Sequence, residues 1–430
     1  MAKDWFGHPR GLATLFFTEM WERFSHNGLR ALLMLYMVGS IQQPGLGFGE
    51  RRAATIYGLY TMLVYLSGIP GGWLADRFLG RYHAVLYGGI IIALGHFSMA
   101  VPGLPFFYLG LGLIVIGTGL LKPNVSSMVG SLYSPEDTRR DAGYSIFYMG
   151  INLGAFIAPL LCGWLAQKYD WHLGFGLAGV GMLAGLVQYV MGKKHLRDMT
   201  QETRDSSGTR EPNAAPLSRG DWSRIGALML LTFFALLFWA GFGQAGTSLT
   251  LFADRATRLT LLGFEFPSSW FQAVEPLFII LFAPLFAWLW LRLGRHEPSS
   301  PVKFTLGLVF LSLSFVLIIP AARMFETSGQ RVSALWLIGL YFLQMVGELC
   351  LSPVGLSLVA RLSPARITGL MMGVWLAATA MGNYVAAWLA GFLEDRTFSY
   401  VFTAAFFGMA VAALLLAVLV RPIKRLMARA

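Results

Sequence analysis

The most chemically informative residues of this chain are ionisable side chains within a long apolar segment near its N-terminus. They are Glu19, Glu22, Arg23, His26 and Arg30. At 100° per residue, an ideal helix places all five within a stripe about 100° wide. Such groups can exchange protons, and they are costly in a bilayer unless they face a cavity or a partner. The stripe therefore predicts a polar interior. The alternative is a salt-bridge cluster that only fixes helix packing.

Three further ionisable residues lie inside apolar runs, each shortly before a proline: Lys122, Glu275 and Glu348. A proline removes a backbone hydrogen bond and loosens the helix locally. Together the three offer one cation in the first half of the chain and two carboxylates in the second. This polarity suits a zwitterion whose carboxylate binds Lys122 and whose amine binds Glu348 or Glu275. Alternatively, each side chain could reach the membrane surface without binding anything.

The elements that must position these groups are transmembrane helices. The chain has 430 residues, of which 56% are hydrophobic and only 13% charged, and apolar runs of about 20 residues recur throughout. The fold class expected is an all-α polytopic membrane protein with twelve helices in two six-helix bundles. The predicted spans are 12–39, 52–75, 83–101, 105–130, 142–167, 172–191, 224–252, 268–291, 303–322, 332–360, 367–392 and 399–420.

Loop charge predicts the orientation of these spans. Of the 33 Lys and Arg residues, 22 fall on the side of the N-terminus and 8 on the other, with three inside spans. By the positive-inside rule, both termini are expected to be cytoplasmic in a multi-pass cell (inner) membrane protein. The polar segment 192–222 is expected to be a cytoplasmic linker between bundles at 1–191 and 223–430. The two halves repeat weakly, because Pro123 and Ser134-Pro135 in the first half correspond to Pro353 and Ser363-Pro364 in the second. Repeated halves with a site near mid-membrane where they meet are typical of secondary transporters.

The composition and motifs argue against several other classes of protein. Most Lys and Arg residues occupy short loops rather than a basic face, which argues against nucleic-acid binding. No HExxH, GxSxG or Walker motif occurs, the seven histidines are scattered, and both cysteines lie in apolar runs. We therefore expect no enzyme activity, metal or cofactor. The expected partners are a small-molecule substrate, protons and the lipid bilayer, with the chain acting as a monomer.

Less specific residues complete the candidate site. The segment GGWLADRFLGRYH holds residues that could latch or release neighbouring helix ends: Gly72, Asp76, Arg77, Gly80 and Arg81. Ordinary positive-inside charge explains its arginines but not its aspartate or glycines. Pocket walls are expected from Tyr60, Tyr148, Asn152 and Trp375, although ordinary packing is the alternative for each.

Several motifs, in order along nearly the whole chain, resemble the proton-dependent oligopeptide transporters of the major facilitator superfamily. Residues 19–24, EMWERF, match the family's ExxERF signature, and GLLKPN, FYMGINLGAFIAPLL, FWAGFGQAGTSL and GELCLSPVGLSLV resemble later family segments. The resemblance implies that Glu19, Glu22 and Arg23 act in proton coupling. It also implies that Lys122 contacts the substrate carboxylate and assists coupling, that Arg30 and Gln244 line the pocket, and that Glu348 receives the substrate amine.

Four departures from the family pattern stand out. His26 and Asn27 replace two tyrosines that usually follow ERFS, and they join the candidate pocket. Gly243 stands where the family has a helix-seven glutamate that pairs with the residue equivalent to Arg30, and Glu275 stands where it has an asparagine. The linker is too short and polar for the two extra helices of many bacterial members. The second and third changes together suggest a carboxylate moved from helix seven to helix eight.

Two classes of function therefore remain open. The leading interpretation is proton-coupled symport of di- or tripeptides or related small zwitterions by alternating access. Its nearest alternative is proton-coupled transport of a cationic amine or modified peptide, which the added carboxylate and lost tyrosines would favour. A transport-dead membrane sensor or a membrane enzyme is the alternative from another class, although buried charges are costly to keep without traffic through the site.

Overall fold

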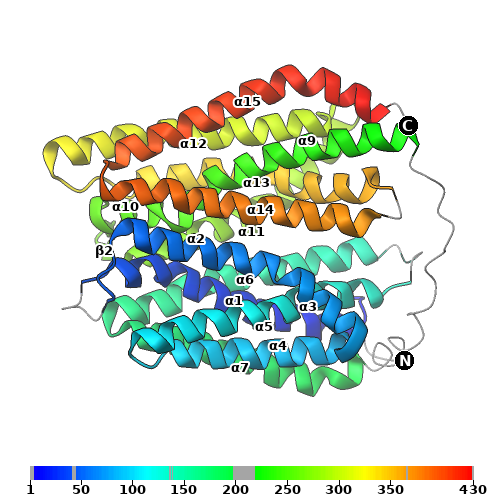
Figure 1. Ribbon diagram of the computed structural model, residues 1–430, viewed down its shortest axis with the longest axis horizontal. Helices are drawn as coiled ribbons and strands as arrows, with labels where there is room; N and C mark the ends of the chain where they lie inside the picture. Colours follow the sequence, from blue (N-terminus) through cyan, green and yellow to red (C-terminus); the bar gives the residue numbers. More distant parts are fainter. Residues whose placement is uncertain are drawn as a thin grey trace. The chain divides into compact units, whose positions relative to one another are not determined.

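The computed structural model describes residues 4–40, 45–134, 137, 139–196, 218–364 and 367–428. Most of the predicted linker, residues 197–217, therefore lies outside the described residues. Nearly every described element is a helix. The first half contains α1 (Arg10–Val38), α2 (Glu50–Leu66), α3 (Gly68–Leu74), a π-helical turn η1 (Ala75–Leu79), α4 (Arg81–Met99), α5 (Leu104–Ser131), α6 (Arg140–Lys168), α7 (Trp171–Met191) and the 3-10 turn η2 (Gly192–His195) (Figure 1).

The second half continues in the same manner after the linker. It contains α9 (Arg219–Phe242), η4 (Gly243–Gly246), α10 (Ser248–Ala256), η5 (Ser268–Trp270), α11 (Phe271–Leu293), η6 (Gly294–His296), α12 (Ser300–Ser328), α13 (Leu335–Leu362), α14 (Thr368–Ala390), η8 (Gly391–Glu394) and α15 (Phe398–Ala428). Between α10 and α11, the two-residue strands β1 (Thr260–Leu261) and β2 (Phe264–Glu265) form an antiparallel hairpin with Thr260 opposite Glu265.

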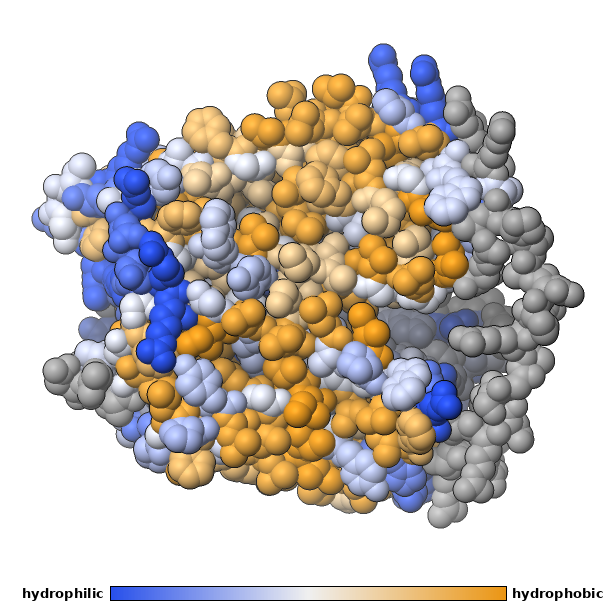
Figure 2. Space-filling model, in the orientation of Figure 1, coloured by the Kyte–Doolittle hydropathy of each residue, from blue (hydrophilic) through white to orange (hydrophobic). Residues whose placement is uncertain are grey.

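The helices have the length and composition of membrane spans. Eleven helical segments of the described chain are long and apolar enough to cross a bilayer, from 50–79 to 398–427. The twelfth long helix is α1, which has 29 residues and carries the ionisable stripe. On the visible face of each unit, hydrophobic side chains cover most of the surface and hydrophilic ones gather toward helix ends (Figure 2). These features confirm the predicted all-α fold of twelve membrane helices.

The chain divides into two compact units. The first comprises Met1–Gly47 and Leu63–Arg210, and the second comprises Phe48–Met62 and Glu211–Ala430. Helix α2 is therefore shared, because its residues up to Met62 group with the second unit. Within that unit, the first turn of α2 is tied by an ion pair of 2.7 Å between Glu50 Oε1 and Arg255 Nη1, and by a pair between Arg51 and Asp395.

Small residues set the helix spacing in the first unit. A Cβ atom added at Gly154 of α6 would lie 2.1 Å from the carbonyl oxygen of Met20 in α1. An atom at Gly150 would meet the ring of Phe16 at 2.9 Å. These glycines bring α6 against the turn of α1 that carries Glu19, Glu22 and Arg23. Close approach through small residues is typical of packed membrane helices.

Two predicted helices end or break differently from expectation. The predicted span 224–252 is interrupted, because α9 stops at Phe242 and the 3-10 turn η4 separates it from α10. The second predicted helix, 52–75, continues through the π-helical turn η1, so Asp76 and Arg77 are helical rather than in a short turn. Gly80 ends this segment with φ +73°, a conformation that glycine adopts without strain.

The glycine contact predicts a stability effect. Gly154→Ala should lower the melting temperature in detergent, because the new methyl group overlaps a backbone carbonyl that only a shift of α1 can relieve. A loss of stability of about 1–3 kcal/mol is typical of such overpacking. The matched control is Gly112→Ala on α5, where an added Cβ meets nothing within 4 Å. Equal melting temperatures for the two variants would contradict the close contact.

Candidate functional site

The ionisable stripe of α1 is buried within the first unit, as the sequence predicted. Glu19 is 2% exposed and Glu22 is 1% exposed, and Arg23 and His26 are also buried. Arg30 is half-buried. The stripe therefore faces protein rather than lipid, because charged groups facing hydrocarbon would lack hydrogen-bond partners.

Arg23 binds both carboxylates of this stripe. Its Nε lies 3.2 Å from Glu19 Oε1 and also donates to Glu22 Oε2. One guanidinium therefore serves two carboxylates, which leaves one negative charge to be balanced when both are ionised. Within the described part of the chain, Glu19 Oε2 and Arg23 Nη2 are buried without a hydrogen-bond partner. The cluster is therefore not saturated by its own members.

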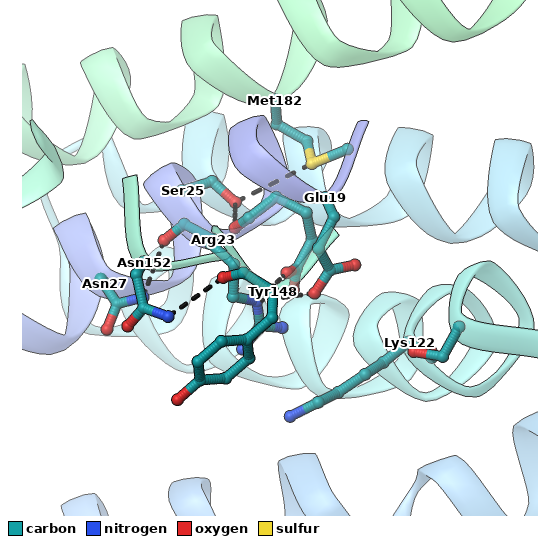
Figure 3. A network of polar contacts seen from close by, with 10 residues as sticks. Glu19, Arg23, Ser25, Asn27, Lys122, Tyr148, Asn152 and Met182 are labelled. Atoms are coloured by element: carbon teal, nitrogen blue, oxygen red, sulfur yellow. Dashed lines mark hydrogen bonds and ion pairs between the residues drawn. The ribbon is translucent and has the colours of Figure 1, made fainter. Parts of the chain in front are cut away.

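Lys122 supplies the neighbouring positive charge. Its side chain extends from α5 toward the Glu19 and Arg23 cluster (Figure 3). Its Nζ lies 4.2 Å from the centroid of the Tyr65 ring, which is within cation–π range. No ion pair within 4 Å joins Lys122 to a carboxylate among the described residues. Its ammonium group is therefore held near the cluster without being locked into it.

Polar side chains on α1 and α6 flank this cluster. The Nδ2 atom of Asn27 donates to the carbonyl of Arg23 at 2.9 Å, and that of Asn152 donates to the carbonyl of Tyr148 at 3.0 Å. Each side-chain amide thus donates one hydrogen bond to a carbonyl of its own helix. Tyr148 is 40% exposed and points away from its helix (Figure 3). The structure brings these residues together with the ionisable stripe in one unit.

The second unit holds the remaining candidate binding residues. Gln244 lies in η4, where its Nε2 donates to the carbonyl of Ala386 at 2.9 Å and its Oε1 accepts from Ser248. In this conformation the Gln244 side chain links η4 to α14 by a hydrogen bond. Trp375 is buried against Phe304, with ring centroids 6.1 Å apart, so packing occupies its ring. Tyr60 is also buried, in the part of α2 that groups with this unit.

Two carboxylates complete the set in the second unit. Glu275 in α11 and Glu348 in α13 are both half-buried. Sequence reasoning missed Gln344, which lies one turn before Glu348 and is fully buried with neither amide atom hydrogen-bonded within the described chain. Its position four residues before a candidate carboxylate was the available signal, because residues i and i+4 share a helix face.

Gly243 leaves no room for the side chain that the family resemblance would place there. An added Cβ would lie 2.7 Å from the Cβ of Ala386 and 3.1 Å from Oδ1 of Asn383. The position is therefore closed by α14.

The candidate gating residues lie at one end of the first unit. Arg81 Nε is 3.8 Å from Asp76 Oδ1, and Arg81 Nη1 donates to Ser131 Oγ of α5 at 3.3 Å. Both partners of the ion pair are exposed, so the pair contributes little stability. Gly72 faces Pro123 of α5, with an added Cβ 3.8 Å from that ring, and Arg77 lies near the rings of Trp73 and Phe78.

In the described chain, eleven apolar helices and a twelfth long helix with a buried charge cluster form an arrangement typical of a membrane transporter. The chain matches the model described as PTR2: POT family over residues 82–209 and 218–414, and it belongs to this family. It is 42% identical to the uncharacterized transporter YclF of Bacillus subtilis, over 91% of this chain and 89% of that protein. It is 37% identical to the peptide transporter YePEPT of Yersinia enterocolitica, over 99% and 96%.

A solved structure agrees with this assignment. A POT family transporter in complex with 5-aminolevulinic acid matches with a TM-score of 0.90 and 32% identity, over 98% of each chain. The family resemblance inferred from the motifs is thereby confirmed. The protein is a transporter and not an enzyme.

The shared guanidinium predicts an unequal response to charge removal. Arg23→Met should destabilise the protein by about 3–5 kcal/mol, because it leaves two adjacent buried carboxylates uncompensated. The triple variant Glu19→Gln, Glu22→Gln, Arg23→Met, which removes all three charges, should recover much of the stability lost in Arg23→Met. Thermal unfolding in detergent measures both effects, with exposed Arg323→Met as the matched control. A triple variant as unstable as Arg23→Met would show that charge balance does not govern the cluster.

Proposed function

We propose that this protein is a proton-driven symporter of di- or tripeptides or related small zwitterions, working by alternating access. The observation that carries the proposal is the buried cluster in which Arg23 binds Glu19 and Glu22 while Lys122 remains nearby. Two carboxylates and one guanidinium carry one excess negative charge. Either a proton or the ammonium of Lys122 can balance this negative charge. When Lys122 moves away from the cluster, a proton can therefore take its place.

The substrate class follows from what such a lysine can bind when it leaves the cluster. Lys122 would bind the substrate carboxylate, and Glu348 would receive the amine. YePEPT is named as a peptide transporter, and the related solved structure holds 5-aminolevulinic acid, which also carries an amine and a carboxylate. Both relatives support a substrate with these two charged groups. His26, Asn27, Arg30, Tyr148 and Asn152 would then line the pocket from the first unit.

A second candidate substrate is a cationic amine or modified peptide. The observation that favours it is Glu275, a half-buried carboxylate where the family resemblance would place an asparagine. We further propose that Glu275 serves in place of the carboxylate that the closed position at Gly243 excludes. Both termini would be cytoplasmic in the cell membrane, by the loop charge. Uptake into proteoliposomes of a peptide and amine panel, with and without an inward acid gradient, tests the proposal.

The coupling role predicts that two assays separate in variants of the cluster. Glu22→Gln and Lys122→Ala should abolish uptake driven by a proton gradient and retain substrate counterflow, because exchange needs no net proton movement. Arg323→Met is the control and should keep both activities. Unchanged gradient-driven uptake in both cluster variants would refute the coupling role.

The relocated carboxylate makes a separate prediction. Glu275→Asn should reduce uptake of amine-bearing substrates and shift the pH dependence of transport, because an anion near the substrate is lost. Gly243→Glu should not rescue it, since its side chain meets Ala386 and Asn383. Exposed Glu326→Gln on α12 is the control. Normal transport and an unshifted pH profile for Glu275→Asn would show that this carboxylate has no part in binding.

A further inference from the structure

A second titratable group of residues lies in the first unit, at the end where α1 finishes and α7 begins. The carboxylate of Asp170 accepts a hydrogen bond from the backbone N–H of His172 at 2.8 Å. It also lies 2.9 Å from Nδ1 of the His172 imidazole ring. The other ring nitrogen, Nε2, is 3.4 Å from the hydroxyl of Tyr36 in α1. This arrangement connects two helices through one imidazole.

The partners assign the hydrogen positions on the His172 ring. An ionised carboxylate can only accept, so Nδ1 carries a hydrogen and donates it to Asp170. In the neutral ring, Nε2 then accepts the hydroxyl hydrogen of Tyr36. When the ring gains a proton, Nε2 becomes a donor and the Tyr36 hydroxyl must turn its hydrogen elsewhere. Protonation therefore reverses one hydrogen bond between α7 and α1.

The accessibility of the group suits exchange with the aqueous phase. The side chain of Asp170 is 35% exposed and that of His172 is 11% exposed, whereas Tyr36 is 3% exposed. A proton can thus reach the ring from the side of the Asp170 carboxylate, and its binding changes the hydrogen bond of the buried Tyr36 hydroxyl. Helix capping explains the Asp170 contact with the backbone but requires neither the imidazole nor Tyr36.

The residue that responds lies where the chain leaves the first unit. The backbone carbonyl of Tyr36 accepts the N–H of Leu46 at 3.0 Å, and that of Gly39 accepts the N–H of Gly47 at 2.9 Å. The first unit's N-terminal segment ends at Gly47, and α2 follows. Tyr36 therefore lies beside the start of the connection between α1 and α2.

The surroundings contain few other ionisable groups. On the neighbouring helices these are Tyr108 near the start of α5, His96 in α4, and Lys168 and Tyr169 at the end of α6. The ammonium of Lys168 lies 5.4 Å from the centroid of the Trp164 ring. Among the described residues, the ion pair of His172 is with Asp170.

We propose that Asp170, His172 and Tyr36 form a second proton-binding site of this transporter, separate from the cluster around Arg23. Its ligand is a proton from the aqueous phase at that end of the unit. Its occupancy sets the rate of the conformational cycle through the α1–α2 connection, and not the proton stoichiometry. The effect on the cycle rests on the proposed function, whereas proton binding at His172 does not.

A fluorescence titration tests proton binding without transport. The ring of Trp171 adjoins His172 in sequence and lies 6.1 Å from that of Tyr36. Because the chain has 13 Trp residues, its signal is taken as the difference between wild type and Trp171→Phe. We expect a pH-dependent transition in this difference signal. It should vanish in His172→Gln, shift by about half to one pH unit in Tyr36→Phe, and persist in exposed His83→Gln.

Substrate counterflow tests the effect on the cycle. The wild-type counterflow rate should change at least about threefold across the pH range of the fluorescence transition. This is less than the tenfold change that corresponds to a free-energy difference of about 1.4 kcal/mol. His172→Gln and Tyr36→Phe should flatten or shift this dependence, and His83→Gln should keep it. A fluorescence transition unaltered in His172→Gln overturns the proton site. A counterflow profile unaltered in both variants, with the transition lost, overturns its effect on the cycle. Absence of counterflow in every protein, including wild type, refutes the proposed function and leaves the titration to decide on the proton site.

Discussion

The charge balance around Arg23 is the interaction on which the first unit depends. A single guanidinium serves two carboxylates in a helix that must cross hydrocarbon, and none of the three groups reaches water freely. Each would be costly alone, so each is kept only with its partners. The same arrangement is short of one positive charge. That deficit makes the cluster sensitive to a proton and to Lys122, and it connects stability with the proposed coupling.

Helix spacing maintains this balance. Gly154 lets α6 approach the backbone of α1 beside Arg23, and Gly181 of α7 lies against Phe24 in the same way. A larger residue at either position would push the helices apart and admit water or lipid to the charges. The apolar packing and the polar cluster are therefore not independent features. The small residues permit the burial that gives the charges their strength, because electrostatic interactions weaken when water enters.

The second unit contains a broken helix, because η4 separates α9 from α10. The turn η4 frees backbone groups between α9 and α10, and one of them, the carbonyl of Ala245, accepts hydrogen bonds from Thr250 Oγ1 and Gln272 Nε2. The same turn presses Gly243 against α14. A glutamate there would need space that the unit does not have, whereas Glu275 on α11 already has a place. The departure that the family resemblance implies at Gly243 thus has a steric counterpart.

Sequence patterns alone predicted the membrane class, the twelve helices and the polar face of α1. These follow from the lengths of apolar runs and from helical periodicity, which depend only on neighbours along the chain. The family motifs added the transporter class, which the comparisons confirm. Broken helices escaped this reasoning, because Gly243–Gly246 lies in an apolar run that could equally continue as a helix.

Which distant groups meet depends on tertiary packing. This packing engages Gln244 with a carbonyl 142 residues away and brings His172 to Tyr36 across 136 residues. Such pairs depend on which faces two helices turn toward each other and on how closely small residues let them approach. Neither quantity is encoded in local spacing, because it results from the packing of the whole unit.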